Sequence, residues 1–147
     1  MKKIAPIVKN FKKIGILILL LITCSIYSMA FKSYQGKNGP VWVAPASTNS
    51  VNNPVKGNAD ATTAGKKTYT TFCVVCHGNK GRGDGIAASG LQKQPADHTS
   101  AKVQSQTDGA LFWKMSEGHS PMPPYKATLS ETQRWQLVNY IRTLAKH

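Results

Sequence analysis

Apolar positions along the chain fall into three regions with different patterns. An unbroken apolar run begins at Ile14, and the uncharged stretch around it continues to Phe31. The next region is rich in Pro, Gly and Asn and has no helical period. The last region repeats its apolar residues at helical spacing. The pattern predicts a leader, an extended tether and one small domain, at residues 1–30, 31–59 and 60–147.

Three helices are expected in the last region, where no segment alternates as a strand does. The first spans about 61–76. The second spans about 108–117, with Thr107 as its cap and Gly118 as its stop. The third begins at Ser130 with the capping box Ser-Glu-Thr-Gln. The residues expected on the inner faces are Tyr69, Phe72, Cys76, Leu111, Phe112, Met115, Leu137, Val138, Ile141, Leu144 and Ala145. The expected fold class is all-α.

The leader has the charge pattern of an export signal. Lysines precede the apolar run, and the first acidic residue of the chain is Asp60. Three fates are open for the leader: cleavage after Ala30, lipidation of Cys24 in a lipobox-like segment, or retention as an anchor. Retention is possible because residues 14–31 would reach about 27 Å as a helix. Each fate predicts an extracytoplasmic, periplasmic location for the domain, with membrane association in the last two.

Composition and charge narrow the class of function. A chain of 147 residues with 41% hydrophobic residues excludes a large multi-site enzyme and a low-complexity chain. The 19 Lys and Arg residues outnumber the 6 Asp and Glu residues, for a formal charge of +13. Because the domain is expected outside the cytoplasm, chromosomal nucleic acid is not an expected partner. The positive charge favours docking to acidic redox proteins or to an anionic membrane surface. Lys80, Arg82, Lys93 and Lys126 flank the two ligand segments, and some of them are expected to form the docking face, the alternative being scattered charge that keeps the protein soluble.

The segment Cys73-Val-Val-Cys76-His77 is the candidate cofactor-binding motif of the chain. Cys-x-x-Cys-His is the attachment motif for c-type haem, in which two thiols form thioethers and the histidine binds the iron. A thioredoxin-like pair would need a βαβ context, and a zinc site would need a second ligand pair. A structural disulfide would leave His77 without a role. The glycine-rich loop that follows lacks the Gly-Lys-Ser/Thr ending of a phosphate-binding loop.

The second axial ligand decides between an electron carrier and an enzyme. The candidates are Met115, Met122, His98, His119 and His147. Met115 lies on an inward helix face, where packing is the usual role of Met. Met122 is expected to be the ligand, because Ser120-Pro-Met-Pro-Pro124 holds it in a stiff segment that cannot be helical. His119 would give a bis-His site and is expected to be exposed, as are His98 and His147.

Residues from about 60 to the end resemble a class I c-type cytochrome, a family with one haem held by His and Met. The resemblance covers about 60% of the chain. The segments that carry it are Gly65-Lys-Lys-Thr-Tyr69, Cys73-Val-Val-Cys76-His77-Gly78, Gly81-Arg-Gly-Asp-Gly85, Asp108-Gly-Ala-Leu-Phe-Trp-Lys-Met-Ser-Glu-Gly118, Met122-Pro123 and Leu137-Val-Asn-Tyr-Ile141. It implies that Gly65 and Tyr69 meet Leu137 and Tyr140 where the first and last helices cross. It also implies that a proline carbonyl accepts the N–H of the iron-binding histidine, with Pro95 as the candidate.

The resemblance implies a one-electron carrier with haem c attached at Cys73 and Cys76 and iron held by His77 and Met122. No catalytic residue and no small-molecule substrate are expected. The leading hypothesis is transfer between a quinol-oxidising complex and a terminal oxidase or reductase of a respiratory chain. The alternative is a dedicated haem subunit of a larger membrane oxidoreductase. An open-iron enzyme or gas sensor is a third hypothesis, against which the single haem motif and Met122 both argue.

Overall fold

Helices carry the fold of the described residues, which are 18–21, 23 and 42–145 in this computed structural model. The elements of the domain are η1 (Ala46–Ser50), α2 (Ala59–Phe72), α3 (Val74–His77), η2 (Ala88–Gly90), α4 (Ala101–Gln104), α5 (Asp108–Glu117) and α6 (Glu131–Thr143). No β-strand occurs among the described residues. The all-α prediction is therefore confirmed.

The chain divides into two units, Met1–Trp42 and Val43–His147. In the first unit residues 18–21 and 23 are helical. Most of the leader, including Cys24 and Ala30, lies outside the described residues. Within the described part of the chain, no helix has both the length and the apolar character needed to cross a membrane.

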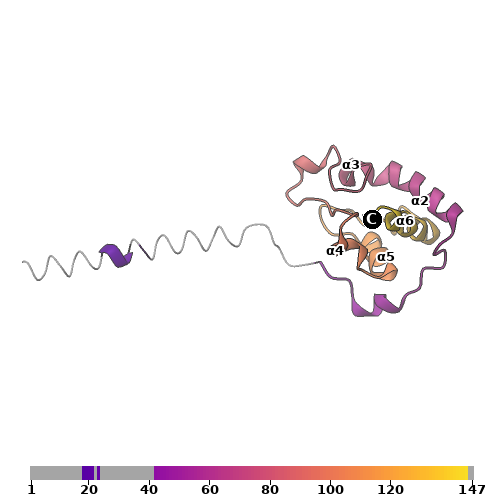
Figure 1. Cartoon of the computed structure of the whole chain (residues 1–147), viewed down its shortest axis with the longest axis horizontal. Coiled ribbons are helices and arrows are strands. Elements are labelled where there is room, and N and C mark those ends of the chain that lie inside the picture. Colours follow the sequence, from indigo (N-terminus) through magenta and orange to yellow (C-terminus); the bar gives the residue numbers. More distant parts are fainter. Residues whose placement is uncertain (1–17, 22, 24–41, 146–147) are drawn as a thin grey trace, which may run out of the picture. The chain divides into compact units, whose positions relative to one another are not determined.

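The first and last long helices of the domain, α2 and α6, pack against each other (Figure 1). They approach so closely at Gly65 that a Cβ there would lie 1.9 Å from the carbonyl oxygen of Gln136. Next to this point Leu137 is fully buried, and the rings of Tyr69 and Tyr140 lie 5.0 Å apart. The crossing expected from the sequence is thus present, and only glycine fits at its closest point.

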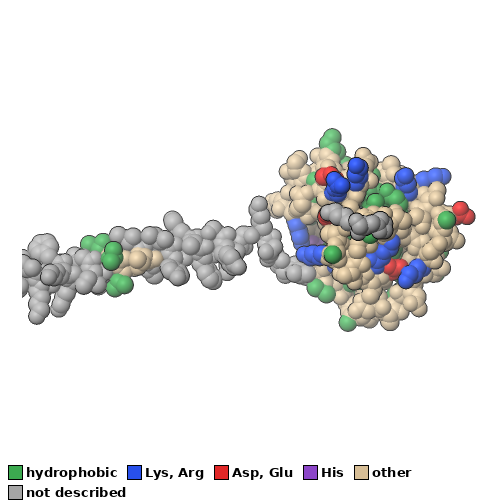
Figure 2. Space-filling view, viewed as in Figure 1, with side chains coloured by type: hydrophobic (Ala, Val, Ile, Leu, Met, Phe, Trp, Pro, Cys, Tyr) green, Lys and Arg blue, Asp and Glu red, His purple; other side chains and the backbone are tan. Residues whose placement is uncertain are grey.

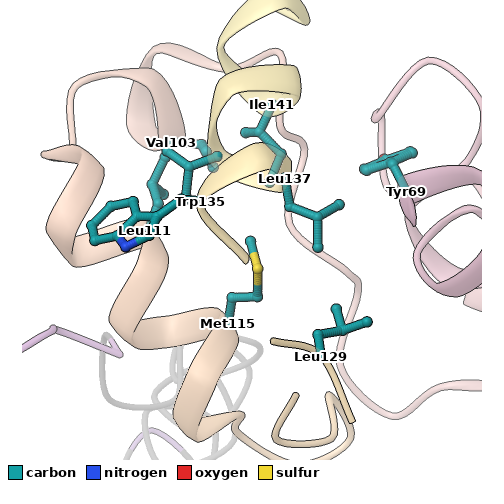
Figure 3. Close-up of a cluster of buried hydrophobic side chains, with 9 residues drawn as sticks. Tyr69, Val103, Leu111, Met115, Leu129, Trp135, Leu137 and Ile141 are labelled. Atoms are coloured by element: carbon teal, nitrogen blue, oxygen red, sulfur yellow. The ribbon is translucent and has the colours of Figure 1, made fainter. Parts of the chain in front are cut away.

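The core lies between α6, α5 and the inner end of α2 (Figure 3). Its buried residues are Tyr69, Val103, Leu111, Met115, Leu129, Trp135, Leu137, Val138 and Ile141. In Figure 3 Met115 of α5 and Leu137 of α6 point toward one another. The expected inner faces are confirmed for α5 and α6, to which the structure adds Trp135 at 3% exposure.

Two predicted helix starts are confirmed by their caps. The Thr107 side chain accepts a hydrogen bond from the Ala110 backbone N–H at 3.1 Å, at the start of α5. Ser130 and Gln133 form a complete capping box at the start of α6. Each cap gives partners to backbone N–H groups that a helix start would otherwise leave unpaired.

From Val43 onward, the segment predicted as a tether over 31–59 is not a separate extended segment, and residues 31–41 lie outside the described residues. From Val43 onward the chain belongs to the same compact unit as the helices. The Asn53 side chain donates to Asp108 Oδ2 at 3.0 Å and to Asn139 Oδ1 at 2.8 Å, and Val55 packs against the core. The expectation was wrong here because pairing between residues this distant in sequence leaves no local periodicity.

Candidate haem site

The Cys-x-x-Cys-His segment forms its own short helix after a break. A single helix was expected from 61 to 76, but α2 ends at Phe72 and α3 begins at Val74. Cys73 lies between them and receives backbone N–H bonds from Cys76 at 3.2 Å and His77 at 2.8 Å. The break therefore places both cysteines and the histidine on a single turn.

Both thiols are free and partly buried. Burial raises the pKa of Cys73 to about 12, and the nearby Cys76 thiol adds to the increase. A thiol with a raised pKa remains protonated at neutral pH, whereas a reactive redox cysteine has a lowered pKa. The raised pKa of Cys73 is opposite in direction to that of the attacking cysteine of a thioredoxin-like site.

The glycine-rich loop supplies hydrogen-bond donors to the end of α3. The carbonyls of Val74, Val75, Cys76 and His77 would have no partner within a helix this short. They accept from the backbone N–H groups of Gly78, Ala87, Gly85 and Gly83, at distances of 2.9, 2.9, 3.1 and 2.9 Å. The loop thus holds the short helix by its backbone, which is a structural role and not phosphate binding.

Glycine is required where this loop touches its neighbours. Gly83 has φ +73°, and a Cβ on it would lie 2.4 Å from the Pro95 carbonyl oxygen. A Cβ on Gly85 would lie 2.4 Å from the carbonyl oxygen of Val75. Side chains at either position would push the loop away from α3.

The His77 imidazole is oriented by the carbonyl of Ala96. Its Nδ1 lies 3.0 Å from Ala96 O, and since a carbonyl only accepts, Nδ1–H is the donor. This tautomer leaves the lone pair on Nε2, the atom that can bind iron. Burial lowers the pKa of His77, which favours the neutral ring. The expected acceptor, Pro95, is wrong by one residue: its carbonyl faces Gly83 instead.

His98 is not the surface residue that was expected. It is partly buried, and its ring stacks on that of His77 with centroids 4.1 Å apart and an interplanar angle of 18°. Its Nδ1 lies 3.3 Å from the Tyr69 hydroxyl. Burial lowers the pKa of His98 to about 3, and His77 adds to the decrease while Asp97 opposes it. The ring is therefore neutral at neutral pH.

Met122 lies in a closed loop that follows α5. The backbones of His119 and Met122 exchange two hydrogen bonds of 2.9 Å around the cis peptide bond between Ser120 and Pro121. A Cβ on Gly118 would lie 2.5 Å from the Pro124 nitrogen. The Met122 side chain is partly buried and packs against the core. The loop therefore fixes the backbone that carries this sulfur.

The other candidate ligands have different surroundings. Met115 is 5% exposed within the core cluster, as its helical position predicted. His119 is exposed, as expected. His147 lies outside the described residues.

Tyr125 connects the Met122 loop to the end of α2. Its hydroxyl donates to the Phe72 carbonyl at 3.2 Å, its ring lies edge-on to that of Phe72, and its backbone N–H donates to Met115 O at 3.1 Å. Burial raises the pKa of Tyr125 to about 12, with smaller contributions from Cys73 and Cys76. The cysteine segment and the methionine loop therefore meet around this residue, which sequence reasoning missed because a lone Tyr in a loop carries no motif.

The residues present fit a covalently attached haem. The donor set comprises two free thiols, an imidazole with a free Nε2 and a thioether sulfur, which are the ligand types of such a group. Apolar side chains that are only partly buried pack against the core: Phe72, Val74, Phe112, Met122, Tyr125 and Leu144. Contact with an apolar ring system would bury more of the surface of such side chains.

Basic side chains surround this part of the domain. Lys80, Arg82 and Lys93 are exposed, and Lys126 pairs with Glu117 at 3.1 Å. Figure 2 shows Lys and Arg spread over the visible face of the domain, with few Asp and Glu among them. The charge excess read from the sequence is therefore a property of the folded surface.

Comparison with known proteins gives matches of two kinds. The sequence model of the cytochrome c family matches residues 62–145. Among solved structures, the chain is similar to a chain of the Kuenenia stuttgartiensis reducing HAO-like protein complex Kustc0457/Kustc0458, with 30% identity and a TM-score of 0.59. That similarity covers 65% of this chain and 50% of that chain, so this chain spans about half the length of that relative.

A second similar structure is the c-type cytochrome KustC0563, with 27% identity and a TM-score of 0.49, over 56% of this chain and 98% of that chain. No curated protein matches the chain. The family match covers more than half of the chain and includes the Cys-x-x-Cys-His segment and the Met122 loop. The chain therefore belongs to the cytochrome c family and carries covalently bound haem c, and a domain of this family implies haem-based electron transfer.

Proposed function

We propose that this protein is a mono-haem carrier of single electrons, with haem attached at Cys73 and Cys76 and iron held by His77 and Met122. The observation that carries the proposal is the contact of Tyr125, which follows the Met122 loop, with Phe72, the last residue of α2 and the residue directly before Cys73. The sequence contains a single Cys-x-x-Cys-His motif, which supports one haem.

When haem is attached, His77 and Met122 would hold its iron. His77 presents Nε2 because Ala96 engages Nδ1, and the backbone bridge at Met122 limits how far its sulfur can move. When bound, the haem supplies a one-electron couple, whose potential Met ligation raises relative to bis-His ligation. The surrounding apolar side chains exclude water, and no substrate bond is made or broken.

Partners are proposed to be redox proteins with acidic docking surfaces. Lys80, Arg82 and Lys93 are exposed on the loop segments that follow His77. Long-range attraction by such charges speeds encounter at low salt and is screened at high salt.

Reversal of Lys80 and Arg82 to Glu should slow reduction or oxidation by the partner at low salt. Reversal of Lys56, an exposed lysine before α2, is the matched control.

The proposed location is the extracytoplasmic side of a respiratory membrane, with electrons passing from a quinol-oxidising complex to a terminal oxidase or reductase. The basic and apolar pattern of the leader supports export. Intact mass measurement of the mature protein separates cleavage after Ala30, lipidation at Cys24 and retention.

A fixed subunit of a larger oxidoreductase is the second candidate. It is favoured by the similarity to a chain of a reducing HAO-like protein complex, of which this chain spans about half. Isolation from native membranes under mild conditions separates the two candidates. A carrier should elute alone, whereas a subunit should elute in constant ratio with other chains.

Spectroscopy of the haem-loaded protein tests the ligation. The ferric protein should show the near-infrared charge-transfer band of a thioether–iron bond, and the ferrous spectrum should not change with carbon monoxide. Met122→Ala should lose the band and bind carbon monoxide, while Met115→Leu, a volume-conserving change in the core, should keep both properties. An unchanged band in Met122→Ala would exclude Met122 as the ligand, and carbon monoxide binding by the unaltered protein would favour an open-iron enzyme or sensor.

A further inference from the structure

A second imidazole lies flat against the ring that binds the iron. The rings of His77 and His98 are nearly parallel, with centroids 4.1 Å apart. The hydrogen bond from His77 Nδ1 to Ala96 O holds the same ring at one edge. A single hydrogen bond leaves a ring free to tilt about that point, whereas a stacked face fixes its plane. The two contacts together restrict the imidazole more than either does alone.

His98 is itself held firmly. Its backbone N–H donates to Gly81 O at 2.6 Å, and its carbonyl accepts from Gln104 Nε2 at 2.6 Å. Because the Tyr69 hydroxyl donates to Gly78 O at 3.2 Å, His98 Nδ1–H is the donor to the Tyr69 oxygen at 3.3 Å.

Tyr69 links the His98 side chain to the core of the domain. Its side chain is 1% exposed, and its ring packs at 5.0 Å from Tyr140 of α6. The hydroxyl reaches Gly78, the residue directly after His77. The stack on His77 is therefore anchored in the closely packed crossing of α2 and α6.

We propose that His98 is a positioning residue that sets the plane of the His77 imidazole on the iron, with Tyr69 holding His98 in place. The proposal rests on the proposed role of His77 as iron ligand. Outer contacts that orient a ligating histidine tune the metal it binds. A ring whose plane is fixed also changes little between the ferric and ferrous states, which favours fast electron exchange.

The test compares four single variants of the full-length haem-loaded protein. His98→Ala removes the ring, His98→Phe keeps a ring face without the nitrogens, and Tyr69→Phe removes only the hydroxyl. Thr99→Ala is the matched control: Thr99 is buried in the same loop and bonds to Asp97, and none of its hydrogen bonds involves His77. Low-spin ferric electron paramagnetic resonance is the main measurement, because its g values depend on the plane of the axial imidazole. The reduction potential is the second measurement.

His98→Ala should shift and broaden the g values and change the potential, and His98→Phe should restore narrow signals close to those of the unaltered protein. Tyr69→Phe should broaden the signals less than His98→Ala. Unaltered g values in His98→Ala, or an equal change in Thr99→Ala, would overturn the proposal. If His98→Ala yields no haem-loaded protein, His98→Leu replaces it, since Leu fills space without a ring face.

Failure of the ligation can be told apart from failure of this proposal. If Met122 does not hold the iron, the unaltered protein lacks the thioether charge-transfer band, and if a histidine does not hold it, the unaltered protein lacks the low-spin g values of a histidine–methionine pair. If the band is present and His98→Ala or His98→Leu still gives unaltered g values, the ligation stands and the positioning role of His98 is wrong.

Discussion

Gly118 is the residue on which the Met122 loop depends most directly. It has φ +66°, and a Cβ there would lie within 2.6 Å of two backbone atoms of Pro123 and Pro124. Backbone atoms cannot move aside as a flexible side chain would, so both the conformation and the space exclude any other residue.

Gly118→Ala should therefore lower the free energy of unfolding by about 1–3 kcal/mol and displace Met122 enough for carbon monoxide to bind the ferrous protein. Gly90→Ala is the control, because nothing lies within 4 Å of a Cβ at Gly90. Chemical denaturation and carbon monoxide titration measure the two effects. Equal stability of the two variants would contradict the close packing at Gly118.

Tyr125 makes stability depend on pH in the alkaline range. Burial raises its pKa from 10.0 to about 12, so the folded protein retains a proton that the unfolded chain has lost. The resulting stabilisation is complete below pH 10.0 and is lost as pH rises toward about 12. In the haem-attached protein the sulfurs are thioethers without charge, and burial remains as the cause.

The free energy of unfolding should thus fall with pH above 10.0, and the fall should be shallower in Tyr125→Phe. The difference in tyrosinate absorbance between the folded unaltered protein and Tyr125→Phe gives the pKa of Tyr125. A Tyr125 that ionises at the ordinary pH would contradict its burial.

At the level of elements, the crossing of α2 and α6 is the least adaptable contact of the fold. The predicted overlap of an added Cβ at Gly65 is with a backbone carbonyl. Gly65→Ala should therefore destabilise by roughly 1–3 kcal/mol, even though Ala favours a helix by about 1 kcal/mol over Gly.

Thr63→Ala, at an exposed position of the same helix, gives the comparison. It should leave stability unchanged or slightly raise it. Thermal and chemical denaturation of the two variants isolate the cost of separating the helices. An increased stability of Gly65→Ala would mean that α2 and α6 can move apart without a cost in the free energy of unfolding.

Sequence patterns predicted those elements whose signals are local. The Thr107 cap and the Ser130 capping box mark helix starts because each satisfies N–H groups within its own turn. The break at Cys73 has no such signal, since α3 is held as a separate turn by backbone N–H groups of Gly83, Gly85 and Ala87 in the loop that follows it. The motif residues were likewise predicted, whereas Ala96 and His98 act through position alone and carry no motif.

The folded domain begins before the region that matches the cytochrome c family, because it includes the residues from Val43 onward. η1 packs on α5 so closely that a Cβ on Gly109 would lie 2.1 Å from Thr48 O. Asn139, buried on α6, uses its side chain to bond both Asn53 and the Val55 carbonyl. The segment from Val43 is therefore part of the folded unit and not a spacer.

Two truncations test this extent of the domain. A chain beginning at Val43 should unfold at the temperature of the full chain. One beginning at Asn58 retains the cap of α2 but leaves buried Asn139 without its partners, at a cost of about 1–3 kcal/mol. For a domain of this size each kcal/mol corresponds to a decrease of about 4–8 °C in melting temperature. Equal melting temperatures would show that residues 43–57 contribute nothing.

The contact between α2 and α6 also fixes the order in which the protein can mature. Its two halves lie far apart in the sequence of the domain, so this high-contact-order step forms late in folding. Before α6 docks, the chain around Cys73 and Cys76 is still open, and docking of α6 then closes the domain.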